Sequence, residues 1–277
     1  MSRSDRAHPE RFQCTATTMN KTPSQLFLRK VRVALTPRSA LLRTRLQNGA
    51  IIEARNRSGY GGRGAYIFGD SLEPELCCLQ AFLGAGHVFV DVGANVGIFT
   101  VKAAKEVGND GLVIAIEPFI ETALQLNNNV RANGYSNVRV RNFCIGRNTQ
   151  HTRLHLNNRK PNSFSLVPNG NAESISVLSV SLDDLCRWEN LNRLDYLKID
   201  AEGAEAAVLA GAQEAISRFR PIVQVEVTIC QSTLSPNYRR FTAPGSMNNV
   251  FIPAEHSNAV ATAMKLGWAE MGPLLTA

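Results

Sequence analysis

Short apolar segments alternate with helical patterns from His87 onward, and this alternation constrains the fold more than any other feature of the sequence. The apolar segments have the length and composition of strands that are buried on both faces. Strands that alternate with helices build a parallel sheet covered by helices on both sides. We therefore predict an α/β fold with a mostly parallel central sheet. The expected strands span residues 87–91, 112–117, 138–144, 152–156, 174–180, 194–200, 221–228 and 250–252, and the expected helices span 96–107, 120–133, 204–218 and 254–266.

The first third of the chain has a different pattern. Residues 1–22 are polar and are expected to form a disordered tail. Residues 24–35 predict a short basic amphipathic helix, which either packs on the domain or lies on a membrane surface. Asn48-Gly49 marks a hairpin turn within residues 40–54. A flexible glycine-rich loop is expected over residues 58–64, and a helix over residues 72–83. We divide the chain into this tail (1–22), a helix and hairpin segment (23–84) and a main domain (85–277).

Positive charge is concentrated before the main domain. Residues 1–63 hold 13 Lys and Arg against 3 Asp and Glu, whereas the rest of the chain holds 17 against 20. This basic N-terminal extension is expected to make weak contacts with acidic partners or a membrane surface. No apolar run approaches the about 20 residues that span a bilayer. No apolar stretch of a secretory signal follows the N-terminus, so we expect a cytoplasmic protein.

The six cysteines form no C-x-x-C pair, and two of them, Cys77 and Cys78, are adjacent. This pattern predicts buried reduced thiols rather than a disulfide framework or a structural zinc site. No cluster of His, Cys and Asp has the spacing of metal ligands. We therefore predict no metal site.

The segment Asp91-Val-Gly93-Ala-Asn95-Val-Gly97 ends the first strand of the main domain and opens a helix. Glycines at such a turn let the backbone approach a ligand closely, and the N–H groups of the helix start point toward it. Ligands of open α/β sheets bind at the carboxyl ends of the strands. The G-x-x-x-G spacing differs from the G-x-G-x-x-G of dinucleotide-binding enzymes. A structural turn without a ligand is the alternative.

Acidic residues follow two neighbouring strands. Glu117 ends the second strand, 20 residues after Gly97, where a carboxylate accepts both ribose hydroxyls of a nucleoside; the alternative is a solvated strand-end acid. Asp200 and Glu202 follow a strand expected beside the first one. As paired carboxylates they would orient a cationic group or take a proton from a substrate hydroxyl.

Helix geometry offers a second interpretation of the acids after this strand. Glu202 and Glu205 would also be favourable in the first turn of the helix that follows, because acids interact well with the positive end of the helix dipole. Glu226, in the fifth strand, is a further acid that could be buried near the site. The sequence leaves these assignments open.

Five segments together resemble the FkbM-type methyltransferase family, in the family's order and over roughly residues 87–228: VFVDVGANVGIFTVKAAKEVG, LVIAIEPF, VSLDDL, LDYLKIDAEGAEAAVLAGA and PIVQVEV. The resemblance implies a Rossmann-like methyltransferase fold that binds S-adenosylmethionine. It also implies methylation of an oxygen, often on a sugar, a glycan or a secondary metabolite. The acceptor would then be a small molecule or a glycan.

The resemblance also implies roles for individual residues. The methionine part of the donor would lie against Asp91, Gly93, Asn95 and Gly97, and Glu117 would hold the ribose. Phe119 would border the adenine, and Asn142 and Cys144 would lie near its edge. Asp200 would lie beside the methyl-bearing sulfonium, and Asp200 and Glu202 are the candidate catalytic residues.

Two other functions are compatible with parts of the sequence. A nucleic-acid methyltransferase would be recruited by the basic N-terminus. Enzymes that methylate base amino groups usually carry an Asn/Asp-Pro-Pro-aromatic element after the fourth strand, where this chain has DAEG. A non-catalytic binding protein on the same fold is the other alternative, although the turn and Glu117 argue against it.

Overall fold

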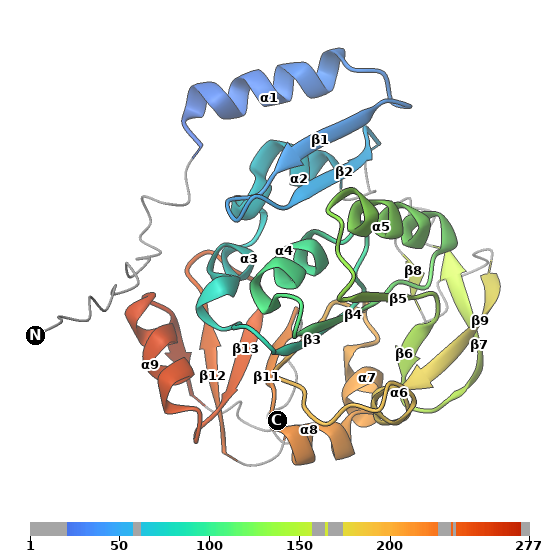
Figure 1. Ribbon diagram of the computed structural model, residues 1–277, viewed down its shortest axis with the longest axis vertical. Coiled ribbons are helices and arrows are strands. Elements are labelled where there is room, and N and C mark those ends of the chain that lie inside the picture. The colour runs from blue at the N-terminus through green and yellow to red at the C-terminus, as the bar shows by residue number, and fades with distance from the viewer. Residues whose placement is uncertain are drawn as a thin grey trace, which may run out of the picture.

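An eight-stranded sheet runs through the centre of the molecule in the order β14-β12-β13-β11-β10-β3-β4-β5 (Figure 1). The computed structural model describes residues 21–57, 62–156, 164–165, 174–226, 234 and 237–272, so the predicted tail lies outside the described residues except for Lys21 and Thr22. The strands of this sheet are β3 (Val88–Val92), β4 (Leu112–Ile116), β5 (Val138–Arg141), β10 (Tyr196–Ile199), β11 (Ile222–Val225), β12 (Tyr238–Thr242), β13 (Asn249–Pro253) and β14 (Ala269–Met271).

The middle of the sheet is parallel, as the alternation predicts. Strands β5, β4, β3, β10 and β11 pair in parallel, whereas β13, β12 and β14 continue the sheet antiparallel beyond β11. The chain winds from β3 outward to β5 and then returns to β10 on the other side of β3. The switch point between β3 and β10 is where an open sheet of this kind provides a binding crevice.

Helices cover both faces of the sheet (Figure 1). Helices α4 (Ile98–Val107) and α5 (Ile120–Ala132) lie on one face, and α6 (Leu182–Trp188), α7 (Glu205–Ala210) and α8 (Gln213–Phe219) lie on the other. Both faces of the sheet need this cover because side chains of β3 alternate between two apolar cores. Phe89 packs into one core, and Val88, Val90 and Val92 pack into the other. Helix α9 (Ser257–Lys265) follows β13. The predicted α/β fold with a mostly parallel sheet is confirmed.

One predicted strand, 138–144, is in fact two. The chain leaves the main sheet after Arg141, because the side-chain amide of Asn142 donates to the carbonyls of Glu117 and Pro118, both at 2.9 Å, instead of continuing the strand. Residues Cys144–Gly146 form β6, the edge of a second sheet with the order β6-β9-β7-β8. The other strands of this small sheet are β7 (Gln150–Leu156), β8 (Phe164–Ser165) and β9 (Ser174–Ser181). The predicted strands at 152–156 and 174–180 are therefore confirmed as an antiparallel pair.

Two predicted helices are interrupted. The prediction of one helix over 204–218 is wrong because the chain breaks at Gly211, where a Cβ would lie 2.2 Å from the carbonyl oxygen of Gly146. The predicted helix over 72–83 is broken at Pro74, which holds Glu73 in an extended conformation with φ −137° and ψ 138°. Around that break lie η1 (Gly69–Leu72), α3 (Pro74–Cys78) and η2 (Leu79–Ala81).

The N-terminal segment contains the predicted helix, α1 (Pro23–Leu35), and the predicted hairpin, β1 (Leu41–Arg45) with β2 (Ile51–Arg55). Part of the expected glycine-rich loop is helical, because α2 (Gly62–Phe68) begins inside it; residues 58–61 lie outside the described residues. Gly62 has a packing reason to be glycine, since a Cβ there would lie 2.5 Å from the Cβ of Ala54. Within the described residues, the glycine pattern therefore marks a close contact at Gly62.

Asparagines of α5 attach the hairpin to the main sheet. Asn133 accepts the N–H of Ile51 and donates to its carbonyl, both at 2.7 Å, and Asn129 does the same with Glu53 at 2.9 and 2.8 Å. Asn129 also donates to the carbonyl of Val96 at 2.8 Å. These side chains take the place of a neighbouring strand for β2. One apolar core continues from the hairpin into the sheet, and the boundary at residues 84–85 stays a prediction.

Candidate active site

Backbone contacts hold the glycine turn after β3 against the neighbouring strands. The N–H groups of Gly93 and Ala94 both donate to the carbonyl of Ile116, at 3.0 and 2.9 Å. Gly93 has a φ of +75°, and a Cβ there would lie 1.8 Å from the carbonyl oxygen of Asp200. Glycine is needed at this position because the ends of β3 and β10 approach each other without room for a side chain.

The buried carboxylate of Glu117 lies directly after β4 and binds the turn. Its Oε2 accepts the N–H of Asn95 at 2.9 Å, and its Oε1 accepts the N–H of Phe119 at 3.0 Å. Burial raises the pKa of Glu117 to about 7, although both N–H groups act in the opposite direction. Each carboxylate oxygen keeps a lone pair with which it can accept a ligand hydroxyl.

A buried lysine connects the ends of β3 and β10. The Nζ of Lys198 lies 3.4 Å from the Asp91 carboxylate and 3.5 Å from the Asp200 carboxylate. Asp91 also accepts the hydroxyl of Thr100, on α4, at 2.7 Å. Burial lowers the pKa of Lys198, but the carboxylates of Asp91, Asp200 and Glu73 outweigh it and raise this pKa above its ordinary value. Lys198 therefore stays charged in the interior.

The loop after β10 has two consecutive residues with left-handed backbones, Glu202 with φ +48° and Gly203 with φ +95°. Glu205 occupies the first turn of α7, and its buried carboxylate accepts the N–H groups of Ala201 and Gly203, both at 3.1 Å. Glu202 lies before this helix. Of the two acids considered for a helix start, only Glu205 has that position.

Glu226 lies directly after β11 and is hydrogen bonded to Asp200. The Glu226 side chain is exposed, rather than buried as the sequence suggested. Partial desolvation, followed by the neighbouring carboxylates of Asp200, Glu202 and Glu205, raises the pKa of Glu226 to about 7. Near neutral pH the carboxyl group of Glu226 is therefore protonated for part of the time.

A cavity opens at the ends of β3, β4 and β10, beside the turn. It brings together the predicted residues Gly93, Asn95, Glu117, Cys144, Asp200 and Glu202. One part of its wall is apolar and includes Pro118, Cys144, Ile145 and Leu154, and the other part is acidic. A flat apolar group such as a base fits the first part, and a cation fits the second.

Four predicted residues lie behind the wall of the cavity. Asp91 is buried beside Thr100 and Lys198. Gly97 caps α4, and a Cβ there would lie 2.2 Å from Cδ1 of Leu126. Phe119 is half-buried at the start of α5 and donates its N–H to Glu117, and Asn142 is exposed and binds the carbonyls of Glu117 and Pro118. In this structure these residues shape the site through their neighbours.

Sequence reasoning gave no role to Lys198 or Leu154. Lys198 has a signal that could have been used, because a lysine within the buried strand of the segment LDYLKID needs an anionic partner. Leu154 reaches the cavity from β7 in the small sheet. Its place depends on the separate path of that sheet, which has no local signature in the sequence.

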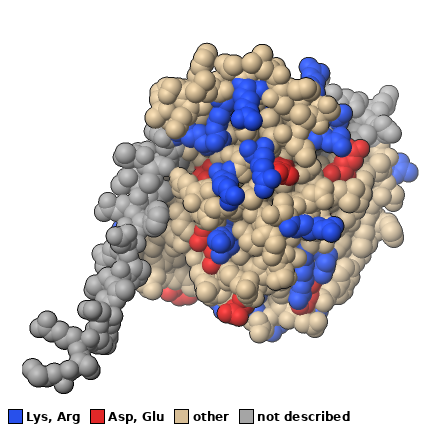
Figure 2. All heavy atoms as spheres, turned by 45° about the horizontal axis from the view of Figure 1, so that its top comes forward, with Lys and Arg blue, Asp and Glu red and all other residues tan. Residues whose placement is uncertain are grey.

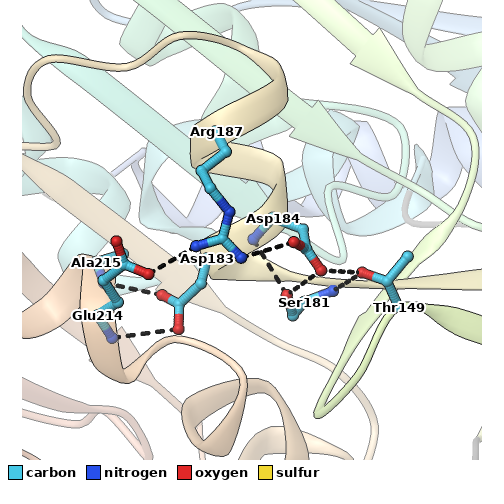
Figure 3. A network of polar contacts seen from close by, with 7 residues as sticks. All are labelled: Thr149, Ser181, Asp183, Asp184, Arg187, Glu214 and Ala215. Carbon is cyan, nitrogen blue, oxygen red and sulfur yellow. Dashed lines mark hydrogen bonds and ion pairs between the residues drawn. The ribbon is translucent and has the colours of Figure 1, made fainter.

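Residues of the VSLDDL segment take part in a polar network (Figure 3), and none of the residues of this network lines the cavity. Asp183 accepts the N–H groups of Glu214 and Ala215 at 3.2 and 2.8 Å, which caps the start of α8. Asp184 accepts the hydroxyls of Thr149 and Ser181 and pairs with Arg187 at 2.7 Å. These contacts join α6 to α8 and to the segment before β7, so they position the small sheet.

The donor predicted from the sequence fits the residues around the cavity. S-adenosylmethionine has an apolar adenine, a ribose with two hydroxyls and a sulfonium cation. The apolar wall, the two free lone pairs of Glu117 and the carboxylate of Asp200 match these groups in that order. The close approach of Gly93 and Asp200 leaves backbone rather than a Gly93 side chain at this part of the cavity wall. The fold and this site define a methyltransferase.

A profile of the methyltransferase FkbM domain matches residues 91–254, more than half of the chain. The chain belongs to the FkbM methyltransferase family. This match confirms the resemblance noted in the sequence and the predicted class, an S-adenosylmethionine-dependent methyltransferase. None of the curated proteins matches the chain at a significant level.

Solved structures similar to this chain include three methyltransferases. The FkbM methyltransferase of Methylobacillus flagellatus KT is 20% identical over 69% of this chain and 53% of its own, with a TM-score of 0.43. An S-adenosylmethionine-dependent methyltransferase of Aquifex aeolicus is 14% identical over 64% and 87%, with a TM-score of 0.35. The O-methyltransferase TomG of Streptomyces achromogenes is 13% identical over 55% and 52%, with a TM-score of 0.33. The chain spans about half of the length of the Methylobacillus protein.

Two features are absent from the described residues. Within those residues, no three His, Cys, Asp or Glu side chains are grouped so that they could bind a metal ion. No helix among them has the length and apolar character needed to cross a membrane.

Proposed function

We propose that this chain transfers a methyl group from S-adenosylmethionine to a hydroxyl of a sugar, a glycan or a secondary metabolite. The observation that carries the proposal is that Asp200, which lines the acidic part of the cavity, is hydrogen bonded to Glu226. A hydroxyl must lose its proton when its oxygen is methylated, and a carboxylate whose pKa lies near 7 is suited to accept that proton.

Each part of the cavity has a role in this proposal. The donor brings an activated methyl group on its sulfonium, so the protein mainly supplies alignment. Glu117 accepts the ribose hydroxyls, and the backbones of Gly93 and Asn95 lie along the methionine part. Asp200 lies beside the sulfonium, and Asp200 with Glu226 takes the hydroxyl proton. Glu202 adds negative charge that keeps the cation in place.

Calorimetry with S-adenosylmethionine tests the donor half of the proposal. Wild-type protein is expected to bind, and Glu117→Ala to bind at least tenfold more weakly, because two charge-assisted hydrogen bonds are lost. Glu121→Ala is the matched control, since Glu121 is an exposed acid in the first turn of α5. No heat with wild-type protein, or equal affinity in the Glu117 and Glu121 variants, would overturn this assignment.

A screen of sugars, oligosaccharides and hydroxylated metabolites tests the acceptor half. At saturating S-adenosylmethionine, where donor binding does not limit the rate, product formation is expected to need the hydroxyl and to rise with pH through about 7, as Glu226 loses its proton. Asp200→Ala is expected to abolish turnover, and Glu226→Gln to remove this pH dependence while donor binding persists. An active enzyme whose pH profile is the same in Glu226→Gln would contradict the role of the pair. The cytoplasmic location stays a prediction.

A further inference from the structure

Helix α1 has one face on the protein and one face in solvent. Thr22 and Gln25 cap its start reciprocally, and Pro23 occupies its first turn. On the inner face, Arg29 donates to the hydroxyl of Thr44 at 3.1 Å and to the carbonyl of Tyr66. Val33 is buried there in a small cluster with Leu42 and Tyr66. The helix is therefore well formed and held in one orientation.

The outer face of α1 is apolar. Its exposed apolar side chains include Phe27 at 65% and Leu35 at 80% exposure, together with Leu28 and Val31. Phe27, Val31 and Leu35 are four residues apart, so they form one stripe along the helix, and Leu28 adjoins it. We call these four residues the outer stripe. Figure 1 shows α1 as the outermost element on its side of the molecule.

Cations border the outer stripe on both sides. At 3.6 residues per turn, Lys30 and Arg32 lie at its two edges, and both are exposed. Residues 21–63 hold ten Lys and Arg against one acid, Glu53. Figure 2 turns this side of the molecule forward and shows Lys and Arg more often than Asp and Glu on it.

This arrangement fits a lipid surface better than other partners. Apolar side chains that enter the acyl region and cations that stay at the headgroup level are what an interfacial helix needs. The phosphates of a nucleic acid would bind the cations but would give the outer stripe no partner. A second copy of the chain would bring Lys30 and Arg32 toward the same residues of its partner across a two-fold axis, and like charges would repel.

We propose that α1 binds the surface of an anionic membrane, with the outer stripe inserted and Lys30 and Arg32 at the headgroups. The remaining cations of residues 21–63 add long-range attraction to the same surface. Binding in this manner is peripheral and reversible. The proposal is independent of the donor and acceptor assigned to the cavity.

Vesicle sedimentation with the full chain tests the proposal. We expect binding to vesicles of phosphatidylcholine with 30–40% phosphatidylglycerol (roughly the charge density of an anionic membrane) and at least tenfold weaker binding to pure phosphatidylcholine. Binding to the charged vesicles should fall several-fold between about 0.05 and 0.3 M salt. Absence of binding to the charged vesicles, or equal binding to both compositions, would overturn the proposal.

Two double variants separate the apolar part from the charged part. Phe27→Gln with Leu35→Gln and Lys30→Gln with Arg32→Gln are each expected to weaken vesicle binding at least tenfold. Glutamine keeps the helix propensity high, and all four side chains are exposed, so thermal unfolding should not change. Leu124→Gln is the matched control, because Leu124 is 57% exposed on α5, outside the N-terminal segment. Wild-type binding in either double variant would contradict the proposal.

Two competing partners give distinct results. If the outer stripe joins two copies, light scattering will show a dimer that Phe27→Gln with Leu35→Gln dissociates. If the cations serve a nucleic acid, a single-stranded RNA oligonucleotide will bind more tightly than the vesicles and the apolar variant will bind it equally well. Either result would overturn the membrane proposal. Monomeric protein that prefers the charged vesicles would support it.

Discussion

The cavity and the N-terminal segment both depend on charged residues, but they place them in opposite surroundings. Around the cavity, Asp91, Lys198 and Glu117 are buried and bound to fixed partners. On α1, Lys30 and Arg32 are exposed beside an exposed apolar stripe. Buried and paired charges fix the positions of strand ends, whereas exposed cations remain available to an external surface. The difference separates the site that we propose aligns a small ligand from the face that we propose binds a charged surface.

Replacement of Lys198 has the largest effect expected from this comparison. Lys198→Met keeps the length of the side chain but leaves the buried Asp91 without its cation. The free energy of unfolding is expected to fall by about 3–5 kcal/mol, as measured by urea denaturation. Lys30→Met makes the same change on α1, where the exposed site should give less than about 0.5 kcal/mol. Similar losses in the two variants would break the comparison.

The glycine turn gives the next largest effect. Gly93→Ala puts a methyl group against the Asp200 carbonyl, so we expect a loss of about 2–4 kcal/mol and loss of donor binding. Gly86→Ala is the matched control: Gly86 has φ +78°, close to the +75° of Gly93, but open space around its Cβ position. Only backbone strain of about 1 kcal/mol should appear there. Urea denaturation measures the loss of stability in both variants, and calorimetry measures donor binding. Equal losses in Gly93→Ala and Gly86→Ala would show that the contact with the Asp200 carbonyl is unimportant.

Titration of Glu117 gives the smallest effect. The pKa of about 7 lies above the ordinary 4.5, so the unfolded chain loses this proton at lower pH than the folded, ligand-free protein does. The free energy of unfolding therefore falls between about pH 4.5 and pH 7, by about 3 kcal/mol at most, and changes no further above pH 7. The ionised form accepts both ribose hydroxyls. S-adenosylmethionine is therefore expected to bind about tenfold more tightly at pH 8 than at pH 6, where about a tenth of Glu117 is ionised.

Calorimetry at the two pH values measures this dependence. Glu117→Ala supplies the control, because its weaker binding should vary little between pH 6 and pH 8. A tenfold change that persists in Glu117→Ala would assign the titration to another group. Calorimetry on wild-type protein and on Glu117→Ala therefore shows whether the buried Glu117 carboxylate binds the ligand or only supports the fold.

Patterns along the chain predicted much of the fold. Apolar runs located β3, β4, β10 and β11, because a strand buried on both faces must be apolar over its whole length. Breaks within helices were missed: Pro74 and Gly211 stand inside otherwise helical patterns, and tertiary contacts decide whether a chain breaks at such residues. Strands β12 and β14 were also missed. They are short antiparallel strands, β14 at the edge of the sheet and β12 next to it, and such strands carry mixed patterns.

The candidate site also contains residues that the sequence predicted and contacts that it did not. Residues that act next to their own strand end, such as Gly93 and Glu117, were predicted from local order along the chain. The pairing of Lys198 with Asp91 and of Glu226 with Asp200 depends on how separate strands align, which a single sequence does not specify. The cavity wall from β7 depends on the same long-range arrangement.

That wall has a consequence for how the enzyme can be altered. Cys144 and Ile145 on β6 and Leu154 on β7 belong to the small sheet, whereas Glu117 and Asp200 follow strands of the main sheet. The apolar wall that we propose faces the adenine can therefore be resized by substitutions in the small sheet, while the acidic residues that we propose lie near the transferred methyl group keep their positions. For protein engineering, the small sheet is a replaceable part in which analogues of the donor with a larger base could be accommodated.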